Sequence, residues 1–267
     1  MQFNSKYFIF DNIDSSMYDF ILCSVQDNSD NVINGLKRSL EETNGINGLK
    51  DLINITNDYI DLNMCITKAT IEGELLPFTK EDNFILNKWL FGHKEYKPLI
   101  VDGIVLNCIF IEGNSFYNEN NQGYINVKMH CEPTMKTLPI VKNLYVKKQK
   151  QIVLDNETNI NENIGVDFAV NIEAGENFII QNLTTGKKFI MNKLNNDSLK
   201  SFKIDSKLRY VESNINRDLN MIKCIDLDNS EYIDLTYGQN ILLITMDKGA
   251  IEVKYQCKIS GRQPSKY

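Results

Sequence analysis

The side chains in this sequence whose types suit acid–base or nucleophilic chemistry are clusters of carboxylates and one neighbouring His–Cys pair. The carboxylates are Glu41-Glu42, Glu81-Asp82 and the run Asp226, Asp228, Glu231 and Asp234. A glycosidase needs two carboxyl groups that face each other across a cleft, and the sequence leaves open whether any of these converge. His130 and Cys131 are adjacent, and adjacent residues of a strand point to opposite faces, so these two side chains cannot meet.

Other catalytic and ligand-binding patterns are incomplete or absent. The sequence contains no Gly-x-Ser-x-Gly, His-Glu-x-x-His or Gly-x-Gly-x-x-Gly. Gly186-Lys187-Lys188 lacks the preceding Gly of a phosphate loop and is typical of a hairpin turn. Residues 226–231 loosely resemble a calcium loop but lack its central Gly and distal Glu. We therefore expect no catalytic residue, no cofactor and no metal.

Composition and charge narrow the classes of partner. The formal net charge is -6 and the pI is about 5.1, which argues against a nucleic-acid-binding surface, because phosphate neutralisation needs clustered Lys and Arg. The one basic cluster, at residues 147–150, is typical of a solvated face. No apolar run approaches the roughly 20 residues that cross a bilayer, so no membrane insertion is expected. The N-terminus does not resemble a secretion signal.

The cysteines also bear on metal binding and on the compartment. Six cysteines are widely spaced without a Cys-x-x-Cys pair, and the chain has two His, so a tetrahedral zinc site would have to be assembled from scattered ligands. Most of the cysteines lie in apolar runs, where thiols behave as small core residues. This usage fits synthesis in a reducing compartment.

The clearest helix signal covers residues 80–91. Thr79 is a suitable N-cap, Asp82 adds negative charge to the first turn, and Gly92 ends the pattern. The apolar positions recur on one side of the helix and are Ile85, Leu86, Trp89 and Leu90. We predict that Trp89, Leu90 and Ile85 anchor this helix to a hydrophobic core.

Strand patterns surround this helix. Residues 3–10 and 20–25 predict an N-terminal hairpin, residues 59–71 a strand, and residues 101–111 and 124–131 two further strands. Residues 26–58 are polar and remain unassigned. The Asn- and Gly-rich stretch between Ile111 and Tyr124 is predicted to be a loop. Its aromatic residues, Phe116 and Tyr117, either fold back onto the sheet or anchor a partner.

The second half consists of short strands separated by polar turns. The predicted strands are residues 152–154, 168–173, 177–182, 188–192, 201–204, 209–212, 232–235, 240–246 and 250–258, and the turns include EAGEN, LTTGKK and MDKGA. Pro133 and Pro139 interrupt ladder bonding and mark a boundary. We therefore predict a mainly β protein with two β-sandwich domains, residues 1–135 with the helix and residues 136–267.

Taken in order, several segments resemble the distal tail protein family of long-tailed bacteriophages. FIFDNIDSSMYDFILCSV resembles its opening hairpin, ILNKWLFGHKEYKPLIVD its helix and following strand, and GYINVKMHCEP its closing strand. NFIIQNLTTGKKFIMN, SFKIDSKLRYV and YGQNILLITMDKGAIEVKY are similar to strands of its C-terminal domain. Each motif alone is weak, but their order and spacing match over nearly the whole chain, and residues 26–58 match least.

This resemblance implies a structural protein without catalytic activity, located in the virion tail tip and assembled in the bacterial cytoplasm. It implies an N-terminal β-sandwich whose copies form a hexameric ring, and a galectin-like C-terminal β-sandwich. The implied partners are other copies of the chain, the tail tube protein, a tail-associated hub or lysin protein, and receptor-binding proteins. A ring needs one patch to meet a different patch on the next copy. Our candidates for the contact are Ser115, Phe116 and Tyr117, or residues 26–58.

Two further functions stay open. The C-terminal domain could bind carbohydrate on the host surface, which needs an aromatic platform with neighbouring polar groups. The tyrosines available for it are Tyr210, Tyr232, Tyr237 and Tyr255. The third hypothesis, an enzyme such as a glycosidase, depends on the scattered carboxylates alone.

Overall fold

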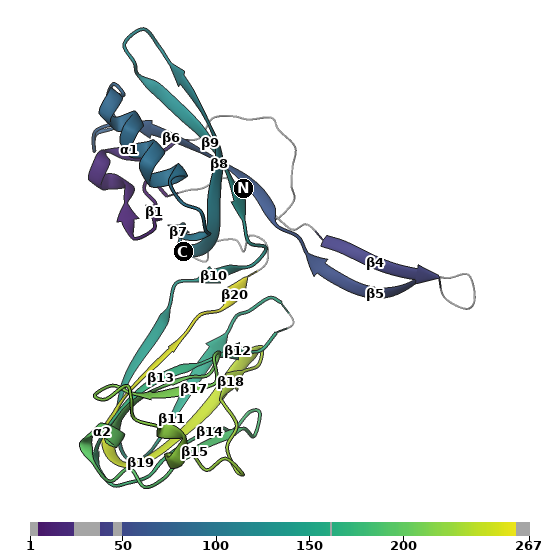
Figure 1. Cartoon of the computed structure of the whole chain (residues 1–267), viewed down its shortest axis with the longest axis vertical. Helices are drawn as coiled ribbons and strands as arrows, with labels where there is room; N and C mark the ends of the chain where they lie inside the picture. The colour runs from purple at the N-terminus through teal and green to yellow at the C-terminus, as the bar shows by residue number, and fades with distance from the viewer. Residues whose placement is uncertain (1–4, 24–37, 45–49, 161, 260–267) are drawn as a thin grey trace. The chain divides into compact units, whose positions relative to one another are not determined.

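The chain forms two compact units rich in strands (Figure 1). The structure is a computed structural model that describes residues 5–23, 38–44, 50–160 and 162–259. Unit 1 comprises Met1–Lys136 and Ile259–Tyr267, and unit 2 comprises Thr137–Lys258. The prediction of a mainly β protein in two parts, with one short helix in the first, is confirmed. No helix of the described residues is long and apolar enough to cross a membrane.

Unit 1 is organised around a curled antiparallel sheet with the strand order β2-β1-β7-β8-β9-β6-β3. Its strands are β1 (Ile9–Phe10), β2 (Ile13–Asp14), β3 (Phe20–Leu22), β6 (Ile60–Lys68), β7 (Lys97–Val101), β8 (Ile104–Tyr117) and β9 (Gly123–Cys131), and the short strands β10 (Met135–Thr137) and β20 (Lys258–Ile259) pair with each other beside β8. Alternate residues of β6 and β9 are buried, so one face of the sheet lines the core.

Helix α1 (Lys80–Phe91) covers the buried face of this sheet (Figure 1). It begins with a capping box: Thr79 Oγ1 accepts a hydrogen bond from Asp82 N (3.1 Å), and the Asp82 carboxylate accepts one from Thr79 N (2.7 Å). Lys68 Nζ lies 2.9 Å from the same carboxylate. The start of the helix is therefore held both by its own backbone and by strand β6.

The residues predicted as core anchors lie on the inner side of α1. Leu90 is fully buried, Trp89 is 5% exposed, and Ile85 is only half-buried at the margin of the core. The indole of Trp89 stacks on Phe8 with ring centroids 5.4 Å apart. Its Nε1 donates a hydrogen bond to the Phe10 carbonyl oxygen (3.0 Å). Helix and N-terminal segment are thereby joined through one side chain.

The predicted N-terminal hairpin is wrong. Strand β1 pairs with β2 and β7, whereas β3 pairs with β6 at the other end of the sheet path. Between them lies the 3-10 helix η1 (Ser15–Tyr18), whose N-cap Asp14 accepts a hydrogen bond from Ser16 N and whose C-cap Asp19 is left-handed. These two local turns redirect the chain, and the aromatic pattern of the two runs does not encode that change of direction.

Residues 26–58, unassigned from the sequence, are described in part. Strands β4 (Arg38–Asn44) and β5 (Lys50–Asn57) pair antiparallel, with a bulge between Glu41 and Glu42. They form a two-stranded sheet of their own. Residues 26–37, which precede β4, and residues 45–49, which connect β4 to β5, lie outside the described residues.

Unit 2 is built around two long strands, β11 (Ile140–Asn156) and β19 (Gly238–Tyr255), which pair along their whole lengths. The other strands are β12 (Ile164–Gly165), β13 (Asp167–Ala174), β14 (Phe178–Asn182), β15 (Lys188–Met191), β16 (Ser201–Asp205), β17 (Tyr210–Ser213) and β18 (Asp234–Leu235), with a short helix α2 (Asp197–Lys200) and a 3-10 helix η3 (Met221–Cys224). The first half of β19 also pairs with β14 and its second half with β13. β19 is thus shared by two groups of shorter strands, on the edge that does not pair with β11.

The predicted MDKGA turn is wrong, because β19 runs through it without interruption. A register shift between Lys147 and Lys148 of β11, where Lys148 has φ 65°, lies opposite this segment. A Cβ on Gly249 would lie 2.4 Å from the Asn171 carbonyl oxygen, so glycine permits close approach of the neighbouring strand β13. Bulge and glycine together bend the long strands where a sequence pattern suggests a break.

Candidate interaction surface at the β8–β9 hairpin

The segment that carries Ser115, Phe116 and Tyr117 is strand rather than loop. Pairing of β8 with β9 resumes after a bulge between Phe110 and Glu112 and continues to Tyr117, opposite Gly123. The connecting turn is only residues 118–122, where Asn118 Oδ1 accepts hydrogen bonds from the backbone N atoms of Asn120 and Gln122 (both 2.9 Å). The predicted loop is therefore wrong over residues 112–117, because cross-strand pairing outweighs the turn-forming composition.

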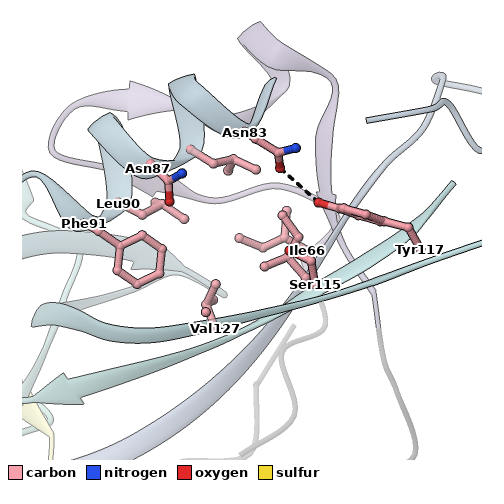
Figure 2. Close-up of a pocket in the computed structure, with 11 residues that line it drawn as sticks. Ile66, Asn83, Asn87, Leu90, Phe91, Ser115, Tyr117 and Val127 are labelled. Atoms are coloured by element: carbon pink, nitrogen blue, oxygen red, sulfur yellow. Dashed lines mark hydrogen bonds between the residues drawn. The ribbon is translucent and has the colours of Figure 1, made fainter. Parts of the chain in front are cut away.

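The pleat of β8 separates the three predicted interface residues. Ser115 and Tyr117 face helix α1, as Figure 2 shows. The Tyr117 ring lies 4.9 Å from the ring of Phe78, and its hydroxyl donates a hydrogen bond to Asn83 Oδ1 (3.0 Å). Desolvation by burial raises the pKa of Tyr117 above its usual value. Tyr117 is thus part of the packing between hairpin and helix.

Phe116 points to the other side of the hairpin and is 52% exposed. Its ring stacks on Tyr124, its direct partner across the two strands, with centroids 5.1 Å apart. Tyr124 is not among the predicted interface residues. Its signal was available, since a five-residue turn between alternating strands places residue 124 opposite residue 116. The structure thus places an aromatic pair at the tip of the hairpin, and only Phe116 of the three predicted residues belongs to it.

A pocket of about 240 Å³ lies between α1 and the hairpin (Figure 2). It is lined by Ile66, Asn83, Leu86, Asn87, Leu90, Phe91, Gly113, Ser115, Tyr117, Ile125 and Val127. None of these lining residues is acidic or basic. The close-up shows apolar side chains at the base and Asn83 and Asn87 on the helix side. Such a lining can accept an apolar group.

A second exposed cluster occupies the outer face of the same sheet. The rings of Tyr59 and His130 stack 5.1 Å apart, and Tyr96 lies 5.6 Å from Tyr59. Asp61 joins the cluster, with Oδ1 2.7 Å from His130 Nδ1 and Oδ2 2.9 Å from Lys128 Nζ. Hydrogen bonds from His130 and then Lys128 hold the pKa of Asp61 below its usual value. Cys131 is buried on the opposite face of the strand.

Three of the carboxylates considered for catalysis have partners in the local structure. Asp82 belongs to the helix cap, and Asp234 Oδ2 lies 2.7 Å from Lys187 Nζ. Both carboxylate oxygens of Asp226 accept hydrogen bonds from Asn229 Nδ2 (3.1 Å each). These bonds close the turn at residues 226–229, within the segment that loosely resembles a calcium loop. Among the described residues, no group of three His, Cys, Asp or Glu is gathered as metal ligands would be.

The four tyrosines considered for carbohydrate binding have different surroundings. Tyr255 is buried and its hydroxyl donates to the Asp155 carbonyl oxygen (3.2 Å). The ring of Tyr232 packs on Phe189 with centroids 5.0 Å apart. Tyr210 and Tyr237 are exposed. Two of the four are therefore committed to packing, which weakens the case for an aromatic platform.

Comparison with known proteins supports one family. Residues 3–133 match the model of the phage tail protein N-terminal domain. A search of curated proteins found no match. Among solved structures, the crystal structure of the Dit protein of phage SPP1, described as a paradigm of the hub adsorption apparatus in phages that infect Gram-positive bacteria, matches with a TM-score of 0.60 and 11% identity over 94% of this chain and 98% of that one.

Two baseplate structures of phage P2 have a similar fold. The structure of its activated conformation with Ca matches with a TM-score of 0.50 and 10% identity, over 94% of this chain and 97% of that one. The structure with Sr matches with a TM-score of 0.50 and 11% identity, over 97% and 98% of the two chains. Residues 3–133 thus match a phage tail protein N-terminal domain, and the chain shares its fold with phage hub and baseplate proteins. Both findings are consistent with the resemblance to the phage distal tail protein family.

Proposed function

We propose that this chain is a structural component of a phage or phage-like tail tip, in which six copies form a ring that joins the tail tube to the hub or baseplate. The observation that carries the proposal is the fold match to the SPP1 hub protein over nearly the full length of both chains, supported by the family match of residues 3–133. The chain acts without catalysis, at the tail tip of the virion after assembly in the bacterial cytoplasm.

We assign the ring to residues 1–135, a β-sandwich domain with the helix, and a galectin-like β-sandwich domain to residues 136–267. The ring docks the tail tube protein on one side and a hub or lysin protein on the other, and receptor-binding proteins are further partners. The second half carries most of one hydrophobic core, which suits a module that is attached to the ring rather than built into it.

Within unit 1, the aromatic pair Phe116–Tyr124 is the contact we propose for the neighbouring subunit. A cyclic assembly needs a heterologous contact, and exposed aromatic residues near the centre of an interface contribute much of its free energy. Phe116 is exposed and already ordered by stacking on Tyr124, so binding would cost little side-chain entropy. Strands β4 and β5 are a second candidate, because among the described residues they form a separate two-stranded sheet, and the edge of such a sheet can pair with a strand of another chain.

Native mass spectrometry of the purified protein, alone and with its tail tube and hub partners, tests the ring. We expect a hexamer, and we expect Phe116→Ser to shift the distribution towards monomer. Phe84→Ser is the matched control, because Phe84 is 67% exposed but lies on α1. Tyr117 is unsuitable for this test because its loss would disturb packing against Phe78 and Asn83.

The results separate the two parts of the proposal. A wild-type chain that stays monomeric in both settings would contradict the ring. A hexamer that persists in Phe116→Ser, with the same abundance as in Phe84→Ser, would exclude the aromatic pair as the contact and direct attention to β4 and β5.

A further inference from the structure

Cys23 and Cys65 lie directly opposite each other at one end of the β3–β6 pairing. The register pairs Leu22 with Ile66, so the next residue along each strand is one of these cysteines. Cys23 N donates a hydrogen bond to the Cys65 carbonyl oxygen (3.0 Å). Opposed residues in a hydrogen-bonded antiparallel pair have Cα atoms about 5.5 Å apart, which is close to the usual Cα separation across a disulfide.

The two thiols are already in contact. Their Sγ atoms are 3.1 Å apart, and one thiol hydrogen-bonds to the other. A disulfide bond is about 2.0 Å long, so its formation requires the sulfur atoms to approach by about 1 Å, which small side-chain rotations supply. Both residues are half-exposed, so a small oxidant in solution can reach them.

The chain contains a second opposed pair that serves as an internal comparison. Cys108 and Cys131 are register partners on β8 and β9, but both are fully buried. The hydrogen bond with Cys131, together with burial, raises the pKa of the Cys108 thiol and suppresses its thiolate. In the Cys23–Cys65 pair, the hydrogen bond between the thiols lowers the pKa of Cys23, while the same hydrogen bond and burial raise the pKa of Cys65.

We propose that Cys23 and Cys65 are an oxidative modification site, at which a low-molecular-weight disulfide such as oxidised glutathione converts the two thiols into an intramolecular disulfide. The Cys23 thiolate attacks one sulfur of oxidised glutathione, the S–S bond of glutathione breaks, and one glutathione leaves as a thiolate. Cys65, once deprotonated, attacks Cys23 in the mixed disulfide and displaces the second glutathione. Two protein thiols are oxidised and one glutathione disulfide is reduced to two thiols, which take up the two protons.

The disulfide would cross-link the short terminal strand β3 to its neighbour β6. β3 has three residues and is the terminal strand of the path. Beyond its ladder with β6, the Leu22 N atom donates one hydrogen bond to the Lys6 carbonyl oxygen (2.8 Å). The cysteines are 42 positions apart, and a cross-link over a loop of this length restricts the unfolded chain substantially. The oxidised chain should therefore unfold at a higher temperature than the reduced one. This inference stands independently of the proposed ring.

The test uses the full chain purified in reductant, exchanged into buffer with or without oxidised glutathione, quenched with acid and counted for free thiols in denaturant. We expect the count to fall from six to four, with the chain still monomeric on a non-reducing gel in denaturant and the new bond mapped to Cys23 and Cys65. We also expect a Tm higher by several degrees. Cys23→Ser and Cys65→Ser should each form no intramolecular disulfide, while Cys108→Ser should form it as the wild type does.

The proposal is overturned by a thiol count that stays at six, by a bond that maps to Cys108 and Cys131, or by disulfides that join two chains. Peptide mapping of the wild type decides between these outcomes even if one of the serine variants does not fold.

Discussion

The indole of Trp89 has two roles in unit 1, and they have different origins in the sequence. Its burial follows from the helical spacing of apolar residues, which also selects Leu90 and the half-buried Ile85. Its hydrogen bond to the Phe10 carbonyl joins residues 79 positions apart, and no local pattern indicates that distance. The pattern at α1 therefore predicts which side chains are buried, whereas their partners depend on the tertiary fold.

Trp89→Phe should lower the free energy of unfolding by about 1–3 kcal/mol, because the buried Phe10 carbonyl loses its donor and the smaller ring leaves space in the core. Urea denaturation followed by far-UV circular dichroism measures this. Phe84→Ala, on the exposed side of the same helix, should change stability by no more than about 0.5 kcal/mol. Equal losses in the two variants would contradict the role of the indole hydrogen bond.

Asp82 makes stability depend on pH. Burial alone would raise the pKa of its carboxyl, but hydrogen bonds from Lys68 and Thr79 outweigh burial and leave the pKa below its usual value. A depressed folded-state pKa stabilises the protein above the unfolded-state pKa of about 3.9. That stabilisation disappears as pH falls through the folded-state pKa.

Asp82→Asn should therefore destabilise the protein most at neutral pH. Its difference from the wild type should shrink as the pH falls below about 4, where the wild-type carboxyl also becomes neutral. Urea midpoints measured across this pH range give the comparison. A difference that is constant with pH would show that the charge of Asp82 contributes nothing.

At the scale of elements, local amino-acid composition predicted a loop and a turn at two places where the structure has a long, continuous strand. Residues 112–117 contain Asn, Ser and Gly and suggest a loop, yet they pair with β9. The Met-Asp-Lys-Gly-Ala segment suggests a turn, yet β19 continues through it. In both places a bulge lets the pairing continue, and a bulge depends on the partner strand, which a single segment does not reveal. Short strands bounded by clear turns, such as β14 and β15, were predicted within a residue or two.

Gly249→Ala should destabilise unit 2 by about 1–3 kcal/mol, because the added methyl group would meet the Asn171 carbonyl oxygen and the neighbouring strand must shift. Calorimetry of the full chain should show the transition of unit 2 moved to lower temperature. Lys147→Ala, an exposed neighbour on β11, should leave it nearly unchanged. An unaffected Gly249→Ala variant would mean that the bend tolerates a side chain.

At the scale of the whole molecule, the resemblance to a family depends on weak motifs that occur in the right order, which is a property of the chain as a whole. No comparable sequence pattern indicated that unit 1 is built from two separate segments of the chain. The chain leaves unit 1 after Lys136 and re-enters it at Ile259, whose side chain is buried in the same core as Trp89. A boundary between two Pro residues suggests two consecutive domains, and a two-residue return strand such as β20 is too short to be recognised.

Ile259→Ala should destabilise unit 1 by about 2–5 kcal/mol, through the transfer and cavity terms of a buried Ile. The fluorescence of Trp89, the single Trp of the chain, reports on unit 1 alone. Ile215→Ala, at an exposed position of unit 2, is the control and should leave the Trp89 transition unchanged. If Ile259→Ala also left it unchanged, residue 259 would be dispensable to that core.

The chain passes from unit 1 to unit 2 and back again, and this affects the order in which the two units can fold during translation. Every residue of unit 2 is translated before Ile259, so unit 2 has its whole sequence available while the core of unit 1 still lacks a side chain. Domains generally fold as they emerge, the N-terminal one first. Here the unit that begins first is completed last. A nascent chain would therefore carry an unfinished unit 1 until residue 259 has left the exit tunnel.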